Sequence, residues 1–241
     1  MSAFLDVHHH FLYGVDDGAA TKLEMQQMLV AAHKDGSRVI IATPHVSPGL
    51  RPVSFDQLNE RIREARAFSQ AYGLDLEVYA GAELLYTYHA QRFLAERRIP
   101  TMAGSDKILI EFSPDVTYQQ IEDAVLNVLR AGYLPILAHI ERYPCLMRAG
   151  RRLRAMKREY DVFFQVNADS VLHGRDFLTN RTVKRAIQEG LVDFIASDAH
   201  NTHRRVSNMQ MAYERLETVF GVECADRLTC NHRSIEWFRN L

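Results

Sequence analysis

The 241-residue chain has no long apolar run and few cysteines. No stretch of about 18 apolar residues occurs, so no segment is long enough for a transmembrane helix. The three cysteines, Cys145, Cys224 and Cys230, form no CxxC pair and no even framework, which is typical of reduced thiols in a cytoplasmic protein. The amino-terminal MSAFLDV lacks a charged region followed by an apolar stretch, and we therefore expect no secretion signal.

Neither sign of charge dominates, because 29 Lys and Arg residues stand against 30 Asp and Glu residues. A basic excess is typical of proteins that bind nucleic acid, so this balance argues against a nucleic-acid partner. The sequence contains no linker, no low-complexity tract and no shift in composition. With 47% hydrophobic residues it is long enough to bury a large core. We therefore expect one domain over residues 1–241.

Short apolar runs recur along the chain, each bounded by Gly, Pro, Asp or Ser. They predict seven strands, at Phe4–His10, Arg38–Pro44, Leu76–Ala80, Ile108–Phe112, Leu134–Ala138, Val162–Val166 and Val192–Ala196. Segments with the apolar period of a helix lie between them. This alternation predicts an α/β fold whose parallel sheet closes into a seven-stranded (β/α) barrel, similar to a TIM barrel. An open doubly wound sheet is the alternative, but no GxGxxG motif opens a helix.

A histidine or a carboxylate follows six of the seven predicted strands, and only the sixth strand ends in an amide, Asn167. The residues are His8, His10, His45, Glu83, Glu111, His139, Asp198 and His200. In a (β/α) barrel the carboxyl ends of the strands share one face, and that face carries the active site. We therefore expect these side chains to converge.

The run of three histidines at the end of the first strand predicts how two ligands are positioned. Side chains alternate across a strand, so His8 and His10 point to one side and His9 to the other. Two imidazoles on one side suit a single ion, and Asp6 on that side suits an acceptor for an imidazole N–H. An HxH pair alone is a weak signal, and a single buried histidine is more often a core residue. The complete set of strand-end residues predicts a metal centre.

Nitrogen and oxygen donors without a thiolate are typical of sites for Mn²⁺, Fe²⁺ or Zn²⁺. The set exceeds the needs of one ion, so we expect two or three divalent ions that share carboxylates. Such clusters suit phosphoester hydrolysis, because they activate water near neutral pH and clamp both oxygens of an in-line displacement. Arg142 and Arg205 lie on the same predicted rim, and guanidinium groups suit a phosphate. The sequence predicts a metal-dependent phosphohydrolase with these two catalytic arginines.

Eight motifs occur in a fixed order over nearly the whole chain: DVHHH, VDDG, ATPH, GAELLY, LIEFS, AHIERYP, QVNADS and IASDAHN. Through them the chain resembles the polymerase-and-histidinol-phosphatase (PHP) superfamily, and within it the CpsB/YwqE-type bacterial tyrosine phosphatases of capsule and exopolysaccharide operons. GAELLYT, IEFS and AHIERY are specific to this branch. Relatives often have a small polar residue where this chain has His9. Because His9 points away from the ligands, we expect little consequence.

The resemblance implies a distorted seven-stranded barrel of the PHP type with a trinuclear centre, for which manganese is the first expectation. It assigns His8, His10, Glu83 and Asp198 to one ion; Glu83, Glu111 and His139 to a second; and Asp17, His45 and His200 to a third. Asp17 rather than Asp16 matches because it directly precedes Gly18. The implied substrate is phosphotyrosine on the tail of a bacterial tyrosine kinase that regulates polysaccharide export. The sequence leaves homo-oligomer formation open.

Alternative functions remain. Cys145 and Arg151 match the Cys-x5-Arg signature of cysteine-dependent tyrosine phosphatases, although the loop is poor in Gly and Pro144 removes an amide donor. An amidohydrolase also begins with HxH, but commonly has a modified lysine at the end of the fourth strand. This chain has Glu111 there, and Lys107 lies near the start of that strand. A PHP phosphatase of small phosphomonoesters such as histidinol phosphate, or a non-catalytic metal-binding scaffold, also stays open.

Overall fold

The structure is a computed structural model that describes residues 2–49, 54–147, 150–172 and 177–241. Its strands are β1 Phe4–His9, β2 Ser37–Ala42, β3 His45–Val46, β4 Glu77–Ala80, β5 Glu83–Leu85, β6 Lys107–Glu111, β7 Leu134–Leu137, β8 Phe163–Asn167 and β9 Phe194–Ala196. Its α-helices are α1 Lys22–Lys34, α2 Phe55–Ala71, α3 Ala90–Ala95, α4 Tyr118–Arg130, α5 Pro144–Met147, α6 Gly150–Glu159, α7 Ala168–Leu172, α8 Phe177–Gln188, α9 Met209–Phe220, α10 Val222–Leu228 and α11 Ile235–Arg239. Two 3-10 helices, η1 Met102–Gly104 and η2 Ile140–Arg142, complete the elements.

The described strands pair in parallel and form two sheets. One sheet has the order β1-β2-β4, and the other has the order β3-β5-β6-β7-β8-β9. Only two residues separate β2 from β3, and two separate β4 from β5. The sheets also approach one another through an isolated parallel bridge between His9 and Ala199. From β5 to β9, each strand therefore pairs with the strand that follows it in the sequence.

The predicted α/β fold with parallel strands is confirmed, and each of the seven predicted runs contains a strand. A single closed seven-stranded barrel is not confirmed, because the second and third predicted strands are each followed after a short break by a further strand that was not predicted, and the described pairing forms two sheets. Pro44 lies at the first break and has no N–H for a ladder. At the second break a Cβ on Gly81 would lie 2.9 Å from the Ile41 side chain, so the chain passes too closely for a larger residue.

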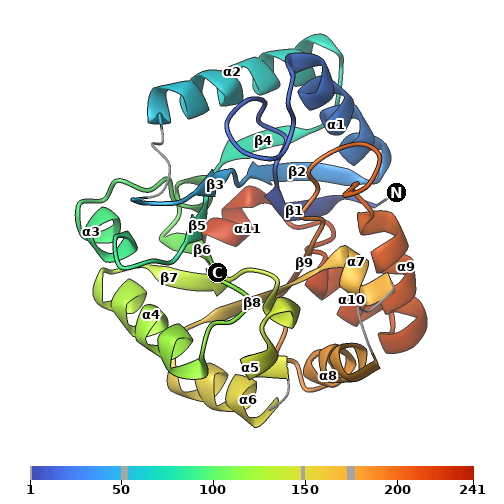
Figure 1. Ribbon diagram of the computed structural model, residues 1–241. Coiled ribbons are helices and arrows are strands. Elements are labelled where there is room, and N and C mark those ends of the chain that lie inside the picture. Colours follow the sequence, from blue (N-terminus) through green and yellow to red (C-terminus); the bar gives the residue numbers. More distant parts are fainter. Residues whose placement is uncertain (1, 50–53, 148–149, 173–176) are drawn as a thin grey trace.

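Most helices lie around the outside of the strands (Figure 1). Ile108 and Ile110 of β6 pack in one buried cluster with Ile121 and Val125 of α4. A second cluster gathers residues from β1, β2, β6, β7 and β9 and is covered by Phe238 of α11. Burial on both faces holds the strands firmly, so the side chains at their carboxyl ends have fixed positions.

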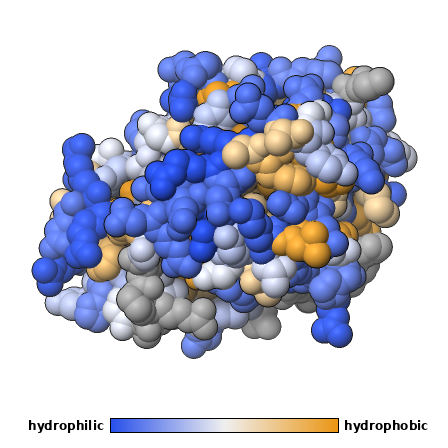
Figure 2. All heavy atoms as spheres, turned by 90° about the horizontal axis from the view of Figure 1, so that it is seen from above, coloured by the Kyte–Doolittle hydropathy of each residue, from blue (hydrophilic) through white to orange (hydrophobic). Residues whose placement is uncertain are grey.

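The face seen from above is mostly hydrophilic, with a hydrophobic patch to the right of its centre (Figure 2). Leu23 and Tyr72 are among the exposed large apolar side chains. None of the described helices combines the length and the apolar character needed to cross a lipid bilayer.

Candidate metal centre and active site

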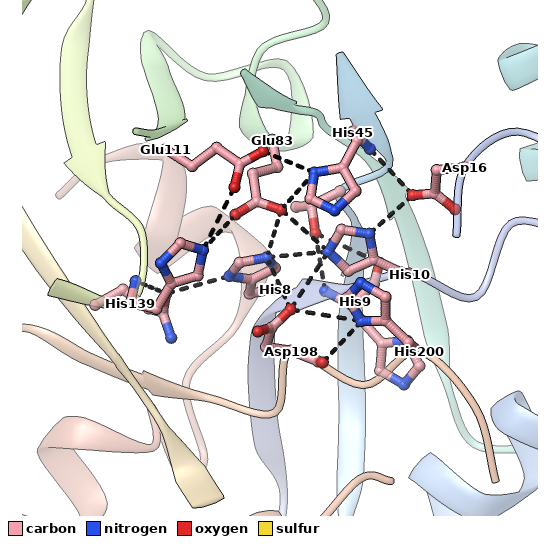
Figure 3. A network of polar contacts seen from close by, with 12 residues as sticks. His8, His9, His10, Asp16, His45, Glu83, Glu111, His139, Asp198 and His200 are labelled. Carbon is pink, nitrogen blue, oxygen red and sulfur yellow. Dashed lines mark hydrogen bonds and ion pairs between the residues drawn. The ribbon is translucent and has the colours of Figure 1, made fainter. Parts of the chain in front are cut away.

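The carboxyl ends of the strands bring the predicted metal-binding residues together in one polar cluster (Figure 3). β1 contains His8 and is directly followed by His10, β3 and β5 each begin with one cluster residue, and β6 ends with another. The remaining members follow β7, follow β9 or lie in the loop before α1. The set comprises His8, His10, Asp17, His45, Glu83, Glu111, His139, Asp198 and His200.

The most deeply buried group consists of His8, His10, Glu83 and Asp198. Both imidazole Nε2 atoms lie close to Glu83 Oε2, at 3.1 Å for His8 and 3.2 Å for His10. The same nitrogens lie 3.4 Å and 3.5 Å from Asp198 Oδ1. Four ligand atoms of this group therefore point at a common centre, as the coordination of one cation requires.

Glu83 extends the cluster towards Glu111. His139 Nε2 lies 2.8 Å from Glu83 Oε1 and 3.8 Å from Glu111 Oε2. His45 Nδ1 lies 3.1 Å from Glu83 Oε2 and 2.8 Å from Glu111 Oε1. Glu83 thus turns one oxygen to each side, which is the geometry of a carboxylate that two cations share.

Asp17 forms the outer edge of the cluster, and its side chain is 61% exposed. Its Oδ1 lies 3.3 Å from His45 Nε2 and 3.4 Å from His200 Nε2. The His200 ring stacks on that of His10 with centroids 3.8 Å apart. This third group faces solvent, whereas the first is enclosed.

Three buried polar atoms in the cluster have no hydrogen-bond partner among the residues that the structure describes: Glu83 Oε2, Asp198 Oδ1 and His200 Nε2. Leaving such groups unsatisfied is costly, and native proteins rarely do so. All three atoms are acceptors that point into the cluster, so a cation satisfies each of them. The donor set therefore fits divalent metal ions.

The outward nitrogens of three imidazoles are held by oxygen acceptors. His8 Nδ1 lies 3.1 Å from Gln165 Oε1, and His10 Nδ1 lies 2.8 Å from Asp16 Oδ2. His200 Nδ1 donates to the Asp198 carbonyl at 2.9 Å. An oxygen acceptor at Nδ1 favours the tautomer with its proton there, and that tautomer leaves Nε2 free to bind metal. The sequence prediction missed Asp16 and Gln165; the pair Asp16-Asp17 was a signal for the first, but nothing local distinguishes Gln165.

The role predicted for Asp6 is wrong. Its Oδ1 accepts from the backbone N–H of Ser197 at 3.0 Å and from that of His8 at 3.3 Å, not from an imidazole. Asp6 therefore joins β1 to the end of β9, below the cluster. Burial raises the pKa of this carboxyl to about 6, although these hydrogen bonds oppose the shift. His9, as predicted, lies outside the ligand groups, with its ring against Phe11.

The cluster shifts the pKa values of its members in opposite directions. Burial acts to lower the pKa of His10, but the hydrogen bond to Asp16 and the negative charge of Glu83 outweigh it and raise the pKa to about 10. Burial and then the charge of His10 lower the pKa of His200 to about 3. Such divergence within one cleft is typical of functional sites.

Two cluster residues have strained backbones. His139 has a φ of 32° and Asp198 has a φ of 52°, both in the left-handed region that residues other than glycine rarely adopt. Each lies just after a strand, where the turn aims its side chain at the cluster. Strain of this kind persists only where the surrounding structure enforces it, and it concentrates at active sites.

Asp198 also faces the two predicted catalytic arginines. Its Oδ2 accepts from Arg142 Nη2 at 2.6 Å, from Arg205 Nη2 at 2.8 Å and from Asn167 Nδ2 at 2.7 Å. Both guanidinium groups therefore lie directly beside the metal-ligand cluster. This arrangement provides positive charge and planar donors where a phosphate next to the cations would sit.

Neither Cys145 nor Lys107, the residues behind two alternative functions, belongs to the ligand groups found among the described residues. Burial, the largest influence, raises the pKa of the Cys145 thiol, although Arg152 opposes it. A reactive cysteine needs a lowered pKa instead. Residues 148–149 of the Cys-x5-Arg segment that begins at Cys145 lie outside the described part of the chain. Lys107 is buried at the start of β6, with Nζ 3.0 Å from Asp106 Oδ1 and near the rings of Phe163 and Phe238. It therefore occupies the opposite end of the strand from Glu111.

Comparison with known proteins identifies the same family as the motifs. Residues 4–235 match the model for capsular polysaccharide synthesis proteins CpsB/CapC. The chain is 31% identical over 229 residues to the tyrosine-protein phosphatase CpsB of Streptococcus pneumoniae, covering 93% of this chain and 94% of that protein. It is 31% identical over 236 residues to the tyrosine-protein phosphatase YwqE of Bacillus subtilis, covering 94% and 89%.

Solved structures agree with the sequence relatives. A structure reported with YwqE of B. subtilis and CpsB of S. pneumoniae, described as unique metal-dependent tyrosine phosphatases, superposes with a TM-score of 0.83. The match has 28% sequence identity and covers 92% of this chain and 89% of that one. From the strand-end cluster, the family model and these relatives, we conclude that the chain belongs to the CpsB/CapC family of capsular polysaccharide synthesis proteins.

Proposed function

We propose that this protein is a metal-dependent phosphotyrosine-protein phosphatase. The observation that carries the proposal is the convergence of buried imidazoles and carboxylates, with three unpartnered acceptor atoms, beside two guanidinium groups. The names of the relatives support the reaction class. Cations and arginines arranged in this way suit a phosphoryl group, which carries negative charge throughout its transfer.

We propose three divalent cations, with Mn²⁺ as the first expectation and Fe²⁺ or Zn²⁺ as alternatives. One is held by His8, His10, Glu83 and Asp198; a second by Glu83, Glu111 and His139; and a third by Asp17, His45 and His200. The short distances from His45 to Glu83 and Glu111 support its sharing in the second site as well. The absence of thiolates from the set supports these ions.

The protein's own residues position the reacting phosphate. Cations bound in the cluster supply Lewis-acid activation of water and of the phosphoryl oxygens. Arg142 and Arg205 donate to the equatorial oxygens and stabilise the charge that develops there. Asn167 holds Asp198 in place when the guanidinium groups engage the phosphate. The phenolate leaving group, with a pKa near 10, needs less help from an acid than an alkoxide does, so no acid is assigned.

The proposal extends to the substrate, the place of action and the fold. The substrate is the phosphorylated tyrosine-rich tail of a bacterial tyrosine kinase that regulates capsule or exopolysaccharide synthesis, and the enzyme acts in the cytoplasm. The free cysteines of the structure support a reducing environment. Residues 1–241 form one domain whose strands make a distorted seven-stranded barrel. The bridge from His9 to Ala199 and the short breaks within the divided strands support this description.

One panel of measurements tests the proposal. The protein is purified without chelator, its metals are counted by mass spectrometry, and phosphate release is compared for phosphotyrosine, phosphoserine and histidinol phosphate. We expect two to three divalent ions per chain and the fastest release from phosphotyrosine. Preference for histidinol phosphate would favour a small-molecule phosphatase, and bound metal without turnover of any ester would favour a non-catalytic scaffold.

A further inference from the structure

A cavity of about 300 Å³ opens beside the metal-ligand cluster. It is bounded by α7, by the beginning of α9 and by the loop that follows β9 (Figure 1). Its charged part consists of three arginines and two carboxylates: Arg142, Arg204, Arg205, Asp169 and Asp198. The same cavity is also lined by three apolar side chains, Leu172, Val206 and Met211. It therefore combines an anion-binding end with an apolar wall.

The apolar wall is exposed to solvent to an unusual degree. Met211 is 55% exposed and Val206 is 36% exposed, which places both among the large hydrophobic side chains that the described surface leaves uncovered. Leu172 is half-buried. Apolar side chains gathered beside a few well-placed polar groups are typical of a ligand site, where the ligand covers them. The ligand that fits carries a doubly charged head and an apolar body.

We infer that Leu172, Val206 and Met211 hold the phenyl ring of a phosphotyrosyl residue whose phosphate meets Arg142 and Arg205. The inference rests on the proposed function and names the residues that select an aryl phosphate. The apolar wall and the two arginines line one cavity. When the phosphate binds the arginines, the phenyl ring attached to it is therefore the part of the substrate that reaches the wall. The thioether of Met211 adapts to an aromatic ring and makes favourable sulfur–aromatic contacts. A phosphoserine has no ring, so it makes no contact with these three apolar side chains.

The test separates ring binding from leaving-group chemistry by using two phosphonates that are not hydrolysed. Phenylphosphonate and methylphosphonate have the same charged head, and only the first has a ring. Their dissociation constants are measured by titration calorimetry on the metal-loaded full-length protein. We expect phenylphosphonate to bind about tenfold more tightly to the unmodified protein, the order expected for contacts of a few carbon atoms in an apolar pocket. In Leu172→Ala and Met211→Ala this advantage should fall towards onefold, with methylphosphonate binding unchanged.

Val219→Ala is the matched control, because Val219 is an exposed apolar residue of the same helix α9 but does not line the cavity. It should keep the tenfold advantage. Met211 is largely exposed, so its truncation leaves the core intact. An undiminished advantage in both wall variants, or an equal loss of affinity for both phosphonates, would overturn the inference. If the unmodified protein releases phosphate from no ester yet prefers phenylphosphonate, the proposed function fails while ring recognition by this wall stands.

Discussion

Arg142 donates a hydrogen bond to Asp198, with 2.6 Å between Nη2 and Oδ2. The other oxygen of the same carboxylate faces the Nε2 atoms of His8 and His10. Asp198 thus stands between the guanidinium side of the site and the imidazole side. One carboxylate therefore contacts both the guanidinium groups and the imidazoles. A substitution at Arg142 tests this arrangement directly.

Substitution Arg142→Ala removes one of the donors proposed for the phosphate. We expect kcat for a phosphotyrosyl peptide to fall by about 10² to 10³-fold, the usual effect of deleting a donor that stabilises transition-state charge. Arg142→Lys should recover only part of this loss, because an ammonium cannot bind two oxygens in a planar fork. Arg92→Ala is the control, since Arg92 is exposed and pairs with Glu96. Rates near those of the unmodified protein in Arg142→Ala would end this assignment.

Substitution His139→Ala removes an imidazole whose Nε2 lies 2.8 Å from Glu83. We expect phosphate release to collapse and at least one metal ion per chain to be lost, as counted by mass spectrometry. The double readout matters because loss of rate with full metal content would assign His139 to the reaction rather than to metal binding. Full activity with full metal content would show that neither role is correct.

Substitution Asp16→Ala removes the acceptor that holds His10 Nδ1, without removing a predicted ligand. Loss of such a partner typically weakens metal binding about 10 to 100-fold, so a shift of that size is expected in the metal concentration that restores activity to the chelator-treated protein. The metal concentration that Asp16→Asn requires should lie between those of the unmodified protein and of Asp16→Ala, because the amide oxygen still accepts one hydrogen bond. Asp75→Ala, at a highly exposed carboxylate, is the control. An unchanged metal requirement in Asp16→Ala would rule out the positioning role.

Chelation and Cys145→Ser give opposite results for the two possible phosphatase mechanisms. For the metal centre we expect a chelator to abolish phosphate release, re-addition of Mn²⁺ to restore it, and Cys145→Ser to have little effect. A thiol enzyme would lose all activity in Cys145→Ser and tolerate the chelator, because its thiolate performs the attack. Burial raises the pKa of this thiol, which disfavours that outcome.

Substitution Thr117→Ala tests a local stability feature far from the chemistry. Thr117 and Gln120 form a capping box at the start of α4. Its loss should lower the free energy of unfolding by about 1 kcal/mol, measured by urea denaturation, with phosphatase activity unchanged. Thr218→Ala is the control, because the Thr218 hydroxyl donates back to the Glu214 carbonyl within α9 and caps no helix end. Equal destabilisation by both changes would contradict the capping account.

The sequence alone determined seven of the strands and the nature of the chemistry, whereas the short strands β3 and β5 were not predicted. Apolar runs, turn residues and strand-end histidines and carboxylates are local signals, so the strands and the set that includes His8, Glu83 and Asp198 were predictable from them. The closure of the sheet was not, because the close approach of the Ile41 side chain to Gly81 exists only in the folded chain. The partners of the imidazoles were also decided by the tertiary structure. Gln165 meets His8 across 157 positions of sequence, and only the folded chain determines such pairings, because they depend on which strands lie side by side.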